Sequence, residues 1–161
     1  MAETEYDPKP FARAKLMGHV SFKGWQAGSL LGVVIAAPIL AYRGKLDASH
    51  LGLYGSSTGL ALTGVTTVLG LAKMSKTDME GVEDRVYRLH YNVGQNRVDR
   101  MVTVGAGVGA GAMLAVAIKD GKPSKEVAIA ALGGAALGSA VGVLVAAAAG
   151  KINAKNMTKE L

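Results

Sequence analysis

The stretch NRVDRMVTVGAGVGAG, residues 96–111, decides the fold, because its glycines fit two incompatible structures. Gly105, Gly107 and Ala110 satisfy G-x-G-x-x-G/A, the pattern that turns a backbone beneath a dinucleotide pyrophosphate. The pairs Gly105/Gly109 and Gly107/Gly111 also form two overlapping G-x-x-x-G motifs, which let two membrane helices approach closely. The residues around the glycines must therefore distinguish a nucleotide loop from a helix-packing surface.

The charged residues directly before these glycines favour the membrane helix. A dinucleotide turn needs a strand at this position. Arg97, Asp99 and Arg100 instead match the mouth of a membrane helix, where long arginine side chains extend to the lipid headgroups. A second interpretation of the same residues is a buried Arg–Asp contact that fixes a hairpin or lines a vestibule. In both interpretations residues 96–111 form the start of a packed span.

Charge is segregated along the rest of the chain. No Asp, Glu, Lys or Arg lies within residues 24–42, 51–72, 101–118 or 127–150. A bilayer core of about 30 Å requires about 20 helical residues. A soluble bundle would carry charges on the outer face of each helix, and these four windows carry none. The sequence therefore predicts an all-α membrane protein with four transmembrane helices.

The segments between the windows predict one domain built from two antiparallel hairpins. Only a short loop separates the first window from the second, and another separates the third from the fourth. The remaining parts are an N-terminal arm (1–23), a connector (73–100) and a basic tail (151–161). Basic residues occur on both sides of the spans, so the orientation of the termini stays open.

Glycines four residues apart occur in every window, so each helix presents a groove for another backbone. The predicted helix-packing residues are Gly24, Gly28, Gly32, Gly55, Gly59, Gly105, Gly107, Gly109, Gly111, Gly134, Gly138 and Gly142. The repetition predicts glycine-zipper packing.

The connector carries one apolar stripe with steps of three and four residues. Its members are Met79, Val82, Val86, Leu89 and Val93. This spacing predicts an amphipathic helix from about Asp78 to Asn92, ended by Gly94. Such a stripe can lie on the membrane surface or against a partner, or it can cover its own bundle. The periodicity does not distinguish these uses.

No catalytic set can be assembled from the sequence. His19, His50 and His90 lie in different regions without metal-ligand spacing, and the chain has no cysteine. Aromatic residues make up 5% of the chain, too few for a nucleic-acid stacking platform, and the net charge of +6 is better matched by anionic lipid headgroups. The chain is predicted not to be an enzyme, and no catalytic residue, metal or cofactor is expected; a structural lipid between the helices is compatible with the sequence.

Asp99 also carries a family resemblance. Alignment on Asp99 places Ala106, Gly107 and Gly111 at the last three positions of the pattern small–x2–aromatic–x10–Arg–x3–Asp–x6–small–Gly–x3–Gly, and Gly81 at the first. With this pattern and four glycine-rich windows, the chain resembles the mitochondrial Tim family of preprotein and amino-acid transporters. It departs from the pattern at the aromatic and arginine positions, which are Asp84 and Gln95.

The resemblance implies a multi-pass protein of the inner mitochondrial membrane. Among the proteins of that family, an accessory subunit of respiratory complex I fits this chain best, because the chain is compact and has no charge within a window. The expectation is a non-catalytic subunit that braces the membrane arm and contacts other membrane subunits, the bilayer and anionic lipids. The alternative is a subunit of a preprotein translocase or solute channel. The expected interface and motif residues are Met79, Val82, Val86, Leu89, Arg97, Asp99 and Arg100.

Overall fold

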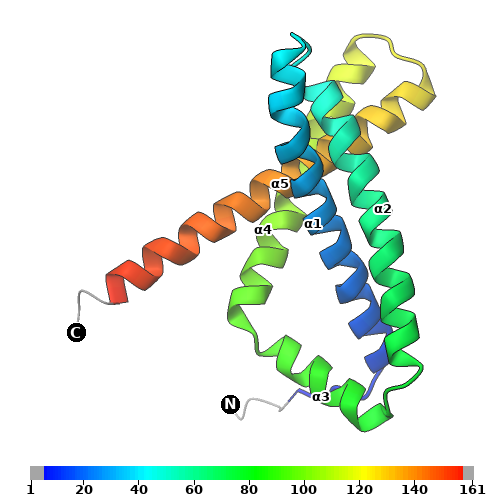
Figure 1. The fold of residues 1–161 in the computed structure, drawn as a ribbon, viewed down its shortest axis with the longest axis vertical. Coiled ribbons are helices and arrows are strands. Elements are labelled where there is room, and N and C mark those ends of the chain that lie inside the picture. The colour runs from blue at the N-terminus through cyan, green and yellow to red at the C-terminus, as the bar shows by residue number, and fades with distance from the viewer. Residues whose placement is uncertain (1–5, 158–161) are drawn as a thin grey trace.

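The computed structural model describes residues 6–157, and this part of the chain is helical without any strand (Figure 1). The helices are α1 (Ala12–Tyr42), α2 (Ala48–Met74), α3 (Met79–His90), α4 (Val93–Lys119) and α5 (Ser124–Met157). The prediction of an all-α fold is confirmed. Residues 1–5 of the predicted arm and 158–161 of the predicted tail lie outside the described residues.

Local sequence signals set several of the helix boundaries. The side chains of Asp47, Asp78 and Asn92 each accept the backbone N–H three residues further on, at 2.9 Å, and so cap the N-termini of α2, α3 and α4. Gly44 and Gly121 have φ angles of 64° and 66°, in the loops that follow α1 and α4. Only glycine adopts this conformation without cost, so both short loops can reverse the chain.

The first two long helices pack antiparallel, with their backbones in close contact. Gly24 of α1 lies against residues 62–66 of α2, and Gly28 lies against Thr58 and Gly59. A Cβ on Gly28 would be 2.7 Å from the Cα of Gly59, closer than two carbons can pack. Thr58 reinforces this contact, because its hydroxyl donates a 2.7 Å hydrogen bond to the carbonyl of Gly28.

The last two long helices pack in the same antiparallel way. A Cβ on Gly105 would overlap the carbonyl oxygen of Gly138, and one on Gly109 would overlap that of Gly134. Gly142 lies against the backbone of α4 at residues 101 and 102. The glycines of α4 and α5 therefore permit an approach that alanine would prevent.

Contacts between α2 and α5 join the two helix pairs. The backbones of Gly52 and Gly133 meet, and Gly55 contacts the Cβ of Ala136. The C-terminal part of α5 runs away from the other helices after this crossing, and α3 spans the ends of α2 and α4 (Figure 1).

Three helices of the described residues, α1, α4 and α5, are long and apolar enough to cross a membrane. This agrees with the predicted membrane class. The predicted window 51–72 forms most of α2, which is not among the three. Threonine, serine and glycine interrupt its leucines and valines and lower its mean hydropathy. The fourth span therefore stays a prediction.

The helix boundaries differ from those expected around the connector. The amphipathic helix ends at His90, and Gly94 lies in the first turn of α4 instead of terminating α3. The cap formed by Asn92 starts a new helix before glycine can end the old one. Arg97, Asp99 and Arg100 consequently lie inside α4, which is continuous with the apolar window 101–118.

Candidate functional site

Polar side chains of α1 and α4 meet at Asp99. The Nζ atom of Lys23 donates to Oδ1 of Asp99 at 2.5 Å, and Nε2 of Gln26 donates to the same oxygen at 2.7 Å. The Nδ1 atom of His19 lies 3.4 Å from the other carboxylate oxygen. Lys23 also donates to Oε1 of Gln26 at 2.7 Å. These four residues, called the Asp99 cluster below, form a closed polar network between two helices.

The Asp99 cluster is largely withdrawn from water. The side chains of Asp99 and Lys23 are 22% and 29% exposed, and Gln26 is 5% exposed as a residue. At this burial a hydrogen bond between charged groups is stronger than at the surface, and an unpaired member costs more. The cluster is therefore a structural tie, unlike the exposed pair of Asp84 and Arg88 on α3.

Helical spacing brings the α1 members together. His19, Lys23 and Gln26 stand at positions i, i+4 and i+7 and so share one face of the helix. Lys23 directly precedes the charge-free residues 24–42, and Asp99 lies two residues before the charge-free residues 101–118. The cluster thus lies where the apolar stretches of both helices begin.

A second polar contact joins α1 to α5. The indole Nε1 of Trp25 donates to Oγ of Ser139 at 2.9 Å, and Ser139 is fully buried. A Cβ on Gly59 would lie 2.9 Å from the Trp25 ring, so the ring depends on glycine at that position. The neighbouring Ser29 is also fully buried, and its Oγ has no hydrogen-bond partner among the described residues.

The Asp99 carboxylate connects α4 to α1. Oδ1 of Asp99 accepts hydrogen bonds from Lys23 and Gln26, and Oδ2 lies 3.4 Å from Nδ1 of His19. Among the side chains described between residues 6 and 150, no group of three or more histidine, aspartate or glutamate residues is placed to hold a metal ion. The geometry is that of a tie between the first helix pair and α4.

A family model described as a protein of unknown function, DUF1757, matches residues 4–153, which include all the members of the Asp99 cluster. The chain belongs to the DUF1757 family. No curated protein matches it.

In this DUF1757 protein the arginines beside Asp99 do not form the Arg–Asp contact that was one interpretation of the sequence. Asp99 pairs with Lys23 of another helix instead. Residues one or two positions away from Asp99 along a helix do not share its face, so Arg97 and Arg100 both point away from Asp99. Arg97 is half-buried and Arg100 is exposed.

The apolar stripe of α3 contributes to the core of its own chain. Val82 and Val86 are 0% and 3% exposed and pack in one cluster with Ala12 of α1 and Met74 of α2. Of the alternatives that the periodicity left open, covering its own bundle is therefore the use of these two valines, and they are not free to bind a partner. Met79, at 42% exposed, lies at the surface.

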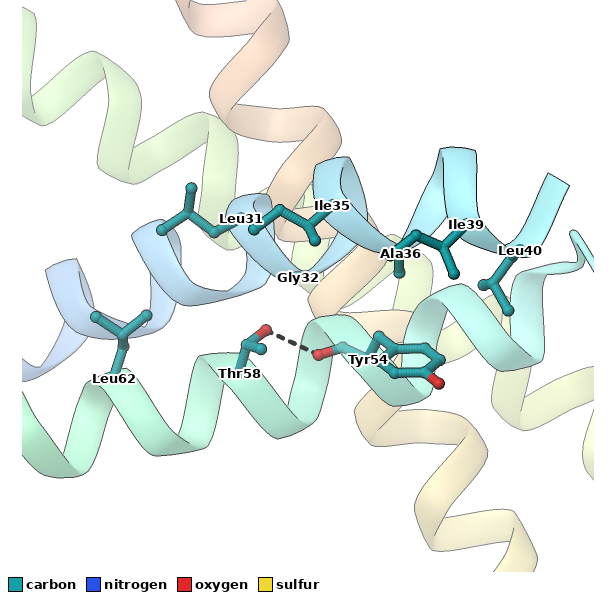
Figure 2. Close-up of a pocket in the computed structure, with 9 residues that line it drawn as sticks. All are labelled: Leu31, Gly32, Ile35, Ala36, Ile39, Leu40, Tyr54, Thr58 and Leu62. Carbon is teal, nitrogen blue, oxygen red and sulfur yellow. Dashed lines mark hydrogen bonds between the residues drawn. The ribbon is translucent and has the colours of Figure 1, made fainter. Parts of the chain in front are cut away.

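The outer face of α1 and α2 carries an apolar groove of about 290 Å³ (Figure 2). Leu31, Ile35 and Ile39 line it from α1, opposite Tyr54 and Thr58 of α2. The Thr58 hydroxyl lies 2.8 Å from the Tyr54 carbonyl, the contact dashed in Figure 2, and this carbonyl and that of Gly28 on α1 share its one proton. The groove therefore presents mainly hydrocarbon.

The partners of Asp99 on α1 were missed from the sequence. His19 and Lys23 lie in the segment 1–23, which was predicted to be an arm, and Gln26 lies in the window 24–42, so no shared helical face was predicted for them. That spacing, directly before a charge-free window, is the signal that could have identified them. Ser139 gives no comparable signal, because one serine among alanines and glycines fits helix packing equally well.

Proposed function

We propose that this protein is a non-catalytic structural subunit of a membrane complex, and that α4 binds a transmembrane helix of a neighbouring subunit. The observation that carries the proposal is the outward face of α4. Gly107 and Gly111 lie on this face with open space around them, unlike Gly105 and Gly109, which pack against α5.

Exposed aliphatic side chains surround this pair of glycines. Val104, Val108 and Ile118 are 59%, 68% and 61% exposed, and they recur at helical spacing on the same side as Gly107 and Gly111. Only 11% of the most apolar stretch of α4 is buried, against 39% for α1. A G-x-x-x-G face between valines is a surface on which a second membrane helix packs closely.

The proposal includes four spans with glycine-zipper packing. The hydroxyls of Thr63, Thr66 and Thr67 on α2 donate to carbonyls within the same helix at 2.7–2.9 Å. A threonine satisfied in this way is compatible with an apolar environment. With α2 as a fourth span, each antiparallel helix pair becomes a membrane hairpin.

The assignment to the inner mitochondrial membrane and to complex I rests on the Tim-type pattern around Asp99. The translocase or channel alternative would require polar groups that face a common path. Thr63, Thr66 and Thr67 of α2 are polar residues within one helix, but their hydroxyls are bonded to carbonyls of that same helix. This weighs in favour of the structural role.

Native gel electrophoresis of mitochondrial membranes tests the proposal. The wild-type chain should migrate with complex I, and Gly107→Ile/Gly111→Ile should release it while leaving its isolated fold intact. Gly64→Ile is the matched control, because Gly64 on α2 also has open space around it. Migration of the wild-type chain only as a small oligomer would contradict the subunit role. Full retention of the double variant in the complex would exclude the α4 face.

A further inference from the structure

We infer that the notch between the first turns of α4 and the C-terminal part of α5 binds the phosphate headgroup of an anionic phospholipid. The notch has a volume of about 640 Å³. Its lining residues are Val93, Asn96, Arg97, Arg100, Met101 and Ala149. This inference does not depend on the proposed function.

The notch lies where α4 and α5 diverge from each other. They are in contact where Gly142 lies against Met101 and Val102, and beyond this point α5 runs away from α4 (Figure 1). Ala149, about two turns beyond Gly142 on α5, lines the notch across from Arg97 of α4.

The guanidinium groups at the notch are available for an anion. Among the side chains described between residues 6 and 150, no ion pair includes Arg97 or Arg100. The neighbouring carboxylate, Asp99, is engaged with Lys23 and Gln26 of α1. Two arginines three residues apart on a helix can both reach one phosphate, to which a guanidinium donates in bidentate fashion.

The position of the notch selects a lipid over a free anion. Met101 begins the charge-free stretch 101–118 of α4, and Ala149 lies at the end of the charge-free stretch 127–150 of α5. The arginines thus stand at the level of the headgroups, and the apolar wall continues toward the acyl chains. A phospholipid satisfies both parts of the notch, whereas inorganic phosphate satisfies only the arginines.

Native mass spectrometry of the full chain in detergent tests this site with added phosphatidylglycerol and phosphatidylcholine. The wild type should retain phosphatidylglycerol in preference, and Arg97→Gln/Arg100→Gln should lower that retention on the order of tenfold. Arg85→Gln/Arg88→Gln on α3 removes the same charge with the same spacing and should retain the lipid.

A variant that keeps every charge separates the notch from bulk electrostatics. Ala149→Trp fills the notch and should also abolish the preference for phosphatidylglycerol, with helicity unchanged by circular dichroism. An equal loss in the two double-arginine variants would overturn the inference. So would unaltered lipid retention by Ala149→Trp, or stabilisation of the wild type by millimolar inorganic phosphate as large as that by the lipid.

Discussion

The ammonium nitrogen of Lys23 lies 2.5 Å from Oδ1 of Asp99, which connects the first helix of one antiparallel pair to the first helix of the other. Gln26, one turn further along α1, donates a second hydrogen bond to the same oxygen of Asp99. Because the residues stand at the beginning of apolar stretches, water replaces the lost partner poorly when one is removed.

Removal of the Lys23 ammonium should destabilise the protein measurably. We expect Lys23→Met to lower the free energy of unfolding by about 1.5–3 kcal/mol, since Asp99 then keeps a charge that is only partly hydrated. Denaturation in mixed micelles measures this. Asp84→Asn is the control, because its pair with Arg88 is exposed and should contribute less than about 0.5 kcal/mol. Similar small losses in both variants would show that Lys23 and Asp99 interact like a surface pair.

Alanine at two glycines of the same helix bundle should have opposite effects. Gly138→Ala should destabilise by about 1–3 kcal/mol, because its Cβ would overlap the carbonyl oxygen of Gly105. Gly107→Ala meets nothing within 4 Å and should be neutral or stabilising by up to about 1 kcal/mol, as expected from helix propensity. Melting temperatures of the isolated chain in detergent compare the two. A loss of stability in Gly107→Ala equal to that in Gly138→Ala would contradict the orientation of α4 about its own axis, in which Gly107 faces away from α5.

The orientation of α4 about its own axis could not be predicted from the sequence. Both Gly105/Gly109 and Gly107/Gly111 satisfy the same motif, and spacing alone cannot select the pair that packs against α5. Which pair faces α5 depends on the contacts that Asp99 makes with Lys23 of α1 and that Val102 makes with Gly142 of α5, and both partners are far away in the chain. Charge segregation and short loops are local properties, so they predicted the all-α class. They did not predict where α1 begins, because its helix starts at Ala12, within the segment 1–23 that was expected to be an arm.

The contacts of Asp99 with α1 likewise could not be predicted from the local sequence. Asp99 stood out because the Tim-type pattern was aligned on it, but a pattern within one segment does not identify a partner on α1. Arginine was expected beside it, and a lysine from 76 residues away pairs with it instead. Long-range pairing of this kind depends on how α5, which packs on both α1 and α4, brings the two helices near each other.

Charge within the α3 stripe should act differently at its buried and exposed positions. Val86→Asp should lower stability by about 3 kcal/mol or more, because Val86 is 3% exposed and an aspartate there would lack a partner. Met79→Asp places the same charge at a residue that is 42% exposed, and should cost less than about 1 kcal/mol. Hydrogen exchange of the α3 amides reports the local effect. Undisturbed protection of α3 in Val86→Asp would show that α3 does not depend on its contact with α1.

Acid should weaken the N-terminal cap of α2. The backbone N–H of His50, with a further bond from its ring, holds the pKa of the Asp47 carboxyl below its ordinary value. Because the pKa is lower in the folded chain than in the unfolded one, the ionised cap stabilises the fold above the unfolded pKa of about 4. This stabilisation is lost as the pH falls through the folded pKa. The difference in melting temperature between the wild type and Asp47→Ala should therefore be present at pH 7 and shrink below about pH 4. A difference that is constant from pH 7 to pH 2.5 would show that ionisation of Asp47 contributes nothing to the cap.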